Sequence, residues 1–385
     1  MSPVERQMPT ADGAAAIELA RELVDKELAP KVTAHEESGR FPRDVFHILG
    51  RAGLLGLPYP EEYGGAAQPY EVYTQVVEEL ARGWLAVGLG VSVHTLSCYP
   101  LATVGTEEQK REWLSDLVGG ELLGAYCLSE PQSGSDAAAL STRAVPDGAD
   151  YRVNGTKAWI SHAGQADFYS MFVRTSDDGS RGISCLLTPA DTPGLTVAPA
   201  ERKMGLKAST TAQIVLDNAR IPVARRLGAE GDGFGIALGA LDGGRLGIAA
   251  CAVGLAQAAL ELAVGHAKER RQFGQTIIDF QGLQFMLADM ATQVAAGRAL
   301  YIAAARRRDA GLPSTAQAAM AKLFCTDMAM KVTTDTVQVL GGYGYVSDFP
   351  AERYMREAKV LQIVEGTNQV QRIVIGRHLQ REPTR

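Results

Sequence analysis

Hydrophobic residues recur with a helical period along the first third of the chain, up to about residue 122. This spacing predicts helices over residues 14–28, 42–52 and 70–81. Proline and glycine residues between these segments separate one helix from the next. The first third is therefore expected to be helical.

From residue 123 to about 233 the pattern becomes that of short strands. Asn154-Gly155 lies between two β-type segments, 151–153 and 156–160, and suits a two-residue type I′ turn, so a hairpin is predicted here. Glycine, proline and aspartate clusters separate further predicted strands at 168–174, 182–188 and 213–217.

The helical period returns at residue 234 and continues to the C-terminus. Hydrophobic stripes run through 253–267 and 283–294, and two more helices are predicted at 316–340 and 369–379. Four successive long helices predict an antiparallel bundle. The chain is thus expected to be α+β, with three domains at 1–122, 123–233 and 234–385.

Composition narrows the class of protein. A chain of 385 residues with 46% hydrophobic and 21% charged residues is typical of a soluble globular protein of two or three domains. A net charge of −6 argues against general nucleic-acid binding. The first fifteen residues contain no secretory signal pattern, and the longest apolar run, 246–256, is about half the length of a membrane span.

The five cysteines are widely spaced and form no Cys-x-x-Cys pair. A disulfide framework or zinc site is therefore not expected, and a reducing cytoplasm is the compartment that fits best. The six histidines include no pair at helical ligand spacing, so no metal site is predicted.

Three short motifs carry candidate chemistry. The segment Cys127-Leu-Ser-Glu-Pro-Gln-Ser-Gly-Ser-Asp136 combines a rigid proline, a flexible glycine and several hydroxyl groups, which suits a flat heteroaromatic ring or a phosphate. Gln338-Val-Leu-Gly-Gly342 and Glu365-Gly-Thr-Asn-Gln369 follow in that order. Taken singly, each has a plain alternative: a capped turn, a Gly-Gly helix stop, and a carboxylate near a helix N-terminus.

Taken together, the motifs resemble the acyl-CoA dehydrogenase family of flavoenzymes over nearly the whole chain. The resemblance implies an N-terminal helical domain, a central β-barrel domain and a C-terminal four-helix bundle. It also implies FAD as cofactor, an acyl-CoA substrate, electron-transfer flavoprotein as electron acceptor, and a homotetramer.

In the family, the residue matching Glu365 removes the α-proton of the thioester while the β-hydrogen leaves as hydride to flavin N5. A carboxylate in water is too weak a base for this step, so the carbonyl oxygen must be stabilised by donors in a dry site. The family uses the backbone N–H of the base and a flavin ribityl hydroxyl. Burial by the bound substrate should expel water and raise the pKa of Glu365, and Thr367 is predicted to cap the following helix.

The resemblance also assigns binding residues. One wall of the flavin site matches Tyr126, Cys127, Leu128, Ser129, Gly134, Ser135, Trp159, Ile160 and Ser161. Positions that grip the dinucleotide of a neighbouring subunit match Arg270, Gln281, Gln338, Val339, Leu340, Gly341 and Gly342, and the flavin-contact segment matches Thr367, Asn368 and Gln369. The acyl-CoA contacts match Ser135, Asp242, Arg245 and Gly366. Trp159 as a core aromatic and Arg245 as a solvated helix-opening charge are the alternative interpretations.

Two positions depart from the common family pattern. Gln132 stands where many relatives carry glycine, and Val364 stands where short- and medium-chain enzymes often carry tyrosine. Together with segments 182–185 and 321–324, Val364 makes the chain most similar to isobutyryl-type members, so a short or short-branched acyl chain is expected. A related flavin oxidase or monooxygenase using oxygen, and a non-catalytic acyl-CoA or flavin binding module, are the alternative functions.

Overall fold

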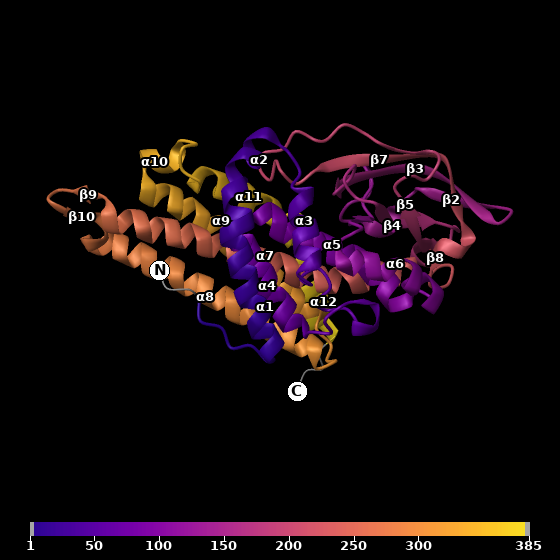
Figure 1. Cartoon of the computed structure of the whole chain (residues 1–385), viewed down its shortest axis with the longest axis horizontal. Helices are drawn as coiled ribbons and strands as arrows, with labels where there is room; N and C mark the ends of the chain where they lie inside the picture. Colours follow the sequence, from indigo (N-terminus) through magenta and orange to yellow (C-terminus); the bar gives the residue numbers. More distant parts are fainter. Residues whose placement is uncertain (1–3, 382–385) are drawn as a thin grey trace.

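The computed structural model describes residues 4–381 of the chain. The molecule is elongated: long helices form most of its body, and the large β-sheet lies at one end (Figure 1). The helices before the sheet are α1 Ala11–Leu23, α2 Val32–Ser38, α3 Arg43–Arg51, α4 Tyr70–Gly83, α5 Leu85–Val104 and α6 Glu107–Gly119.

The predicted helices at 42–52 and 70–81 correspond to α3 and α4, and 14–28 corresponds to α1 with a π-helical turn, Val24–Leu28, behind it. The helical period did not indicate α5 or α6. Nearly every residue of α5 is buried, so that helix has no polar face and gives no periodic signal.

Eight strands form one sheet. They are β1 Gly124–Cys127, β2 Arg143–Asp147, β3 Asp150–Ser161, β4 Phe168–Arg174, β5 Ile183–Pro189, β6 Leu195–Val197, β7 Thr211–Pro222 and β8 Arg226–Leu227. The paired strands follow the order β6-β7-β3-β2-β4-β5-β8, with β1 parallel to β4. This is an open path, so strand pairing among the described residues does not close the expected barrel into a hydrogen-bonded ring.

The predicted hairpin turn at Asn154-Gly155 is wrong, because both residues lie inside β3. The pairing with β7 changes register between Val153 and Gly155, which marks a β-bulge. A Cβ on Gly155 would lie 2.5 Å from Oγ1 of Thr142, so glycine is required there for packing. The tight turn instead joins β2 to β3 at Gly148, whose φ is +67°.

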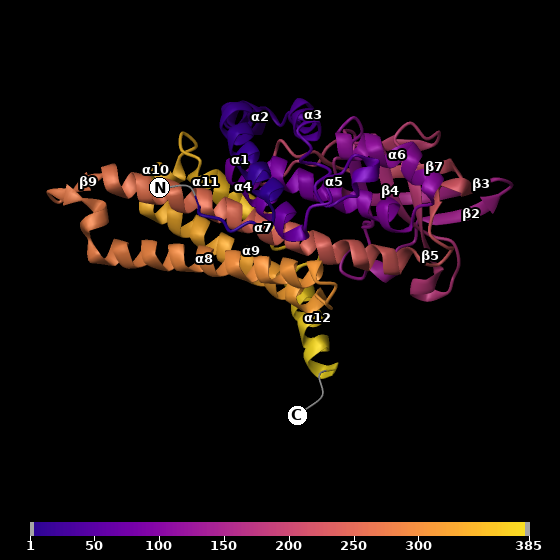
Figure 2. The ribbon, with the colours of Figure 1, turned by 60° about the horizontal axis from the view of Figure 1, so that its bottom comes forward.

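After the sheet, the chain is again helical apart from a short hairpin. The elements are α7 Gly233–Glu269, β9 Arg271–Gln272, β10 Gln275–Thr276, α8 Gln281–Asp309, α9 Thr315–Leu340, α10 Gly342–Tyr345, α11 Ala351–Leu361 and α12 Asn368–Arg381. Helices α7, α8 and α9 run alongside one another, whereas α12 projects sideways from the body, away from both of its ends (Figure 2). Three of the four expected long helices therefore pack lengthwise, and α11, which the hydrophobic pattern did not indicate, packs on α9 and α7.

Two helices, α5 and α7, are long and apolar enough to cross a membrane by length and composition alone. Within the most apolar window of each helix, 89% of α5 and 83% of α7 are buried inside the protein. Both therefore have the character of core helices.

Candidate active site

Glu365 lies in the turn between α11 and α12, in a conformation that disfavours a side chain. Its φ is +54°, and that of the following Gly366 is +89°. A left-handed glutamate is an unusual and strained choice. The residue as a whole is partly exposed, but both carboxyl oxygens are buried and lack a hydrogen-bond partner among the described residues. The carboxyl group of Glu365 therefore forms no hydrogen bond that would stabilise the fold within the described residues.

The electrostatic surroundings of Glu365 suit proton transfer near neutral pH. Burial raises the pKa of Glu365 to about 8, although the charges of Lys322 and Arg245 act in the opposite direction. A base works best when its pKa lies near the working pH.

A buried lysine on α9 donates hydrogen bonds to the turn that carries Glu365. Lys322 Nζ donates to the carbonyl oxygen of Gly366 at 2.9 Å and to Oδ1 of Asn368 at 2.8 Å. Gln371 Nε2 donates to the same Gly366 oxygen at 2.8 Å. Sequence reasoning missed Lys322 as a site residue, because it is 43 positions from the turn and only the fold brings the two together.

The side chain of Asn368 is buried and hydrogen-bonded within the protein. Its Nδ2 donates to Oγ1 of Thr326 at 2.9 Å and to Oδ1 of Asp327 at 2.7 Å, and only 3% of the residue is exposed. Its predicted role as a flavin contact is therefore not supported for the side chain. Thr367 caps α12 as predicted, because its Oγ1 accepts from the backbone N–H of Val370 at 3.2 Å.

Helix α7 passes directly beside the carboxyl group. A Cβ placed on Gly244 would lie 2.0 Å from Oε2 of Glu365, so only glycine leaves the carboxyl group its present position. The next residue, Arg245, is buried and donates to Oδ1 of Asp242 at 2.6 Å. Because Arg245 is 5% exposed, its interpretation as a solvated helix-opening charge is wrong, whereas its predicted contact with the acyl-CoA stays a prediction.

The flavin-wall segment begins in the interior next to α7. Tyr126 Oη donates to the carbonyl oxygen of Ala237 at 3.1 Å. Burial raises the pKa of Tyr126, and the charges of Cys185 and Glu365 raise it further. The segment and the candidate base are thus within electrostatic reach of each other, as their predicted roles require.

The carboxylate inside this segment has a structural role. Glu130 pairs with Lys157 at 2.7 Å, and both side chains are almost fully buried. Burial alone would raise the pKa of Glu130, but the charge and hydrogen bonds of Lys157 and the amides of residues 141 and 142 lower it to about 2. This ion pair fixes the loop that follows β1 to strand β3.

Trp159 is not a core residue. Its side chain is 62% exposed, and its φ of +62° is strained for an aromatic residue. The backbone N–H of the preceding Ala158 donates to Ser129 O at 2.9 Å, which joins the two segments of the predicted flavin wall. Ile160, by contrast, is buried. A large exposed aromatic in a strained conformation is typical of a ligand-stacking platform.

The predicted glycine of the loop behaves differently from expectation. Gly134 does not have a positive φ, and a Cβ placed on it would meet no atom within 4 Å. The neighbouring Ser135 is exposed. Internal packing therefore does not require glycine here, and open space surrounds both residues.

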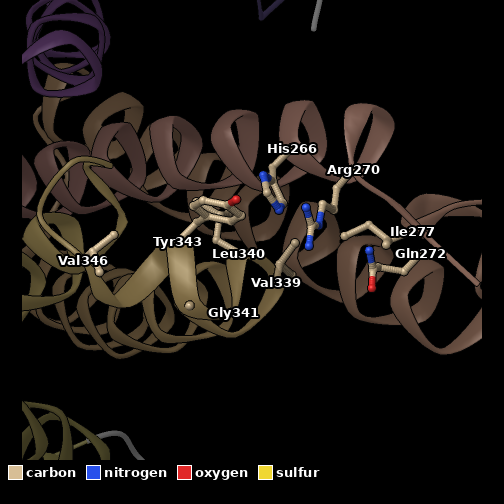
Figure 3. A pocket seen from close by; sticks show the side chains of 10 residues that line it. His266, Arg270, Gln272, Ile277, Val339, Leu340, Gly341, Tyr343 and Val346 are labelled. Carbon is tan, nitrogen blue, oxygen red and sulfur yellow. The ribbon is translucent and has the colours of Figure 1, made fainter.

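A second group of predicted residues lines a cavity of about 580 Å³ where α7 meets α9 and α10. Figure 3 shows Arg270, His266 and Tyr343 around it, together with Leu340 and Gly341. The Arg270 guanidinium stacks 5.5 Å from the ring centre of Tyr343. Val339 and Gly342 also line the cavity, whereas Gln281 and Gln338 do not. His266 and Tyr343 were not predicted.

The sheet that carries the first group of predicted cofactor residues lies apart from the cavity that carries the second (Figures 1 and 2). Strand β3, which carries Trp159, belongs to the sheet, and β9 and α10 flank the cavity at Arg270. One copy of the chain therefore does not bring both groups around a single dinucleotide.

A further cavity of about 440 Å³ opens between α4, α5 and α7. Tyr70, Tyr99, Thr95, Leu96, Ala240 and Gly243 are among the residues that line it. Leu96 Cδ1 lies 3.1 Å from the Cβ position of Gly244, next to the carboxyl group of Glu365, so the cavity adjoins the candidate base. No sequence motif indicated this cavity, because its walls come from helices α4, α5, α7 and α8 and from the segment before α4.

Comparison with known proteins agrees with this arrangement. Residues 10–121 match the model of the acyl-CoA dehydrogenase N-terminal domain, 125–219 that of the middle domain, and 231–380 that of the C-terminal domain. An acyl-CoA dehydrogenase of Bacillus subtilis is 46% identical over 94% of this chain and 96% of its own length.

Two solved structures are also very similar. Butyryl-CoA dehydrogenase from Megasphaera elsdenii superposes with a TM-score of 0.95 at 40% identity, covering 98% of this chain and 100% of its own. A structure described as the electron transferring flavoprotein of Acidaminococcus fermentans has a TM-score of 0.96 at 43% identity, with the same coverage.

Proposed function

The chain belongs to the acyl-CoA dehydrogenase family and is an FAD-dependent oxidoreductase, and we propose that it oxidises a short or short-branched acyl-CoA with Glu365 as the base. The product is the 2-enoyl-CoA thioester. The proposal rests on the carboxyl group of Glu365, whose oxygens are buried and have no hydrogen-bond partner among the described residues. Its pKa is about 8, and it lies next to a cavity.

Glu365 takes the α-proton of the thioester in this proposal. Its carboxylate can accept a proton near neutral pH because burial has already made the protonated form favourable. The turn holds the oxygens free of other donors, and Gly244 leaves room for them on α7. The buried surroundings exclude water, which strengthens any donor placed at the thioester carbonyl.

The residues present fit FAD. Trp159 offers an exposed aromatic face, and the cavity at Arg270 offers a guanidinium beside a glycine-rich backbone turn, which suits a phosphate. Bound FAD supplies the acceptor for the β-hydrogen. We assign the ring to Trp159 and the loop after β1, and the dinucleotide end to the cavity of a neighbouring copy.

The separation of these two groups supports a homo-oligomer, and we propose a homotetramer with domains at 1–122, 123–233 and 234–385. The matched family regions fall close to these boundaries. Sedimentation should therefore detect an oligomer. Arg270→Ala should release FAD although the flavin-ring site at Trp159 is left intact. A monomer that retains FAD as tightly as the native protein would contradict this assembly.

The substrate class rests on Val364 and on the butyryl-CoA dehydrogenase that the chain resembles. We propose a soluble cytoplasmic enzyme that passes its electrons to electron-transfer flavoprotein. The description of the relative from Acidaminococcus fermentans supports that partner class.

The test is anaerobic reduction of the purified flavoprotein by a panel of acyl-CoA thioesters: butyryl, isobutyryl, 2-methylbutyryl, isovaleryl and octanoyl. Flavin bleaching should be fastest with a four- or five-carbon chain. Reoxidation should be fast with electron-transfer flavoprotein and slow with oxygen while product is bound. Fastest bleaching by octanoyl-CoA would overturn the substrate class, and rapid reoxidation by oxygen would identify an oxidase.

A further inference from the structure

Lys322 is one of the most completely buried cations in the described part of the chain. It extends from α9, its exposed fraction is 0%, and its ammonium group reaches the turn that carries Glu365. A buried lysine is costly unless its charge is used. Its hydrogen-bond partners on this turn are a backbone carbonyl and an amide oxygen, and neither is charged.

We propose that Lys322 is a positioning residue for proton abstraction, which holds the Glu365–Gly366 turn against α9 and whose charge sets the pH range in which Glu365 acts. The inference rests on the proposed role of Glu365 as base. Lys322 does not touch the reacting atoms, so its effect is exerted through the turn and through its charge.

Two hydrogen bonds of Lys322 hold the turn in place. Lys322 donates to the carbonyl oxygen of Gly366 at 2.9 Å, and this residue has a φ of +89°. It also donates to Asn368 Oδ1 at 2.8 Å, at the start of α12. These two bonds join both sides of a turn that includes a strained glutamate, so the surrounding structure maintains a conformation the chain would not otherwise favour.

Two cations act on the carboxyl group of Glu365 from neighbouring helices. Lys322 on α9 and Arg245 on α7 both lower the pKa of Glu365 against the larger effect of burial. Arg245 is already paired with Asp242, which reduces its effect, whereas Lys322 faces neutral partners on the turn. Tyr70 on α4, Tyr126 on β1 and Cys251 on α7 also interact with Glu365, and burial raises the pKa of all three, so they are neutral at physiological pH.

Lys322 itself responds to its surroundings. Burial lowers the pKa of Lys322 to about 8, while the charges of Glu365 and Asp327 raise it and Arg245 lowers it. The lysine and the glutamate therefore titrate as an interacting pair. Removing the lysine charge makes the glutamate harder to ionise, so the pKa of Glu365 rises above its present value.

Gln371 provides a matched control. Its Nε2 donates to the same carbonyl oxygen of Gly366 at 2.8 Å, and it is also fully buried. Lys322→Met and Gln371→Met each remove one donor to that oxygen with a side chain of similar length. Only the first removes a charge.

The experiment measures kcat/KM against pH for the native holoenzyme and both variants, with FAD content as a check on folding. Lys322→Met should shift the acidic limb upward by at least about half a pH unit, and Gln371→Met should leave it in place. Equal shifts in the two variants, or no shift in Lys322→Met, would overturn the proposal. If Lys322→Met does not fold, Lys322→Gln provides the same test, since it keeps a donor and loses the charge.

A second readout does not depend on turnover. Infrared difference spectra between each protein and its Glu365→Gln counterpart isolate the C=O stretch of the protonated Glu365 carboxyl group. Its titration midpoint should be higher in Lys322→Met than in the native protein. If Glu365→Gln leaves turnover intact, the proposed function fails; if that variant is inactive but the midpoint is the same with and without Lys322, only this inference fails.

Discussion

Replacing Lys157 by methionine tests how the loop of the flavin wall is held. In the native protein Lys157 and Glu130 form a buried pair at 2.7 Å, with side chains 0% and 1% exposed. The variant leaves the Glu130 carboxylate buried without its cation. Breaking such a pair from one side typically costs about 3–5 kcal/mol. Glu130 retains donors from Thr142, Ser141 and Gln132, so we expect the lower end of that range.

The stability of the native protein and that of the Lys157→Met variant should change with pH in opposite directions. Glu130 has a pKa of about 2 in the folded protein, below its ordinary value of 4.5, so its contribution to stability is present above pH 4.5 and is lost as the pH falls towards 2. Without Lys157, burial raises this pKa instead. The variant should then lose stability as the pH rises above about 4.5.

A cofactor-bound multidomain protein does not unfold in two states, so midpoints are compared in place of a free energy of unfolding. The assay measures the urea midpoint and the Tm of each protein at fixed protein and FAD concentrations. We expect a Tm at pH 7 lower by roughly 5 °C or more, together with weaker FAD retention. Adding Glu130→Gln to Lys157→Met should restore part of the loss, since no buried charge then remains. A single variant as stable as the native protein, or a double variant no better than the single one, would refute the reasoning.

Two other substitutions address the ligand sites directly. Trp159→Ala should weaken FAD binding by about 5-fold or more, because an aromatic pair contributes about 0.5–1.5 kcal/mol beyond its buried area. The control variant Trp159→Phe should retain most of the affinity. Unchanged FAD affinity in Trp159→Ala would show that the exposed ring does not stack on the cofactor. Val364→Tyr adds a ring to a packed position, so kcat/KM should fall roughly 10-fold more for isobutyryl-CoA than for butyryl-CoA, and equal losses would mean that Val364 does not sense the branch.

The order of helices, strands and helices follows from hydrophobic period alone, but the details required tertiary context. Strand β4 was predicted at its observed bounds, 168–174, because glycine and aspartate residues isolate it on both sides. Asn154-Gly155 satisfied the local rule for a turn, yet packing against Thr142 uses the glycine for a bulge within a longer strand. Local preference was outweighed by a close contact with a residue 13 positions away.

The candidate site was predictable where a motif is continuous in sequence, and not where the fold assembles it. Glu365 and Thr367 lie in one short motif and occupy the environments expected of them. Lys322, Gly244 and Leu96 come from three helices, and nothing in the sequence relates them to the turn. Arg245 illustrates the limit of residue-type reasoning, since an arginine that suits a solvated helix start is here buried and paired with Asp242.

The central claim is that Glu365 is the base, and the rate of anaerobic flavin reduction by the preferred acyl-CoA tests it most directly. Glu357→Gln is the matched control, because Glu357 is a second buried carboxyl group in α11 whose pKa burial also raises to about 8. Glu365→Gln should lower the rate by roughly 100-fold or more with FAD still bound, while Glu357→Gln should reduce the flavin at close to the native rate. Native-like reduction in Glu365→Gln would contradict the account and place the base elsewhere.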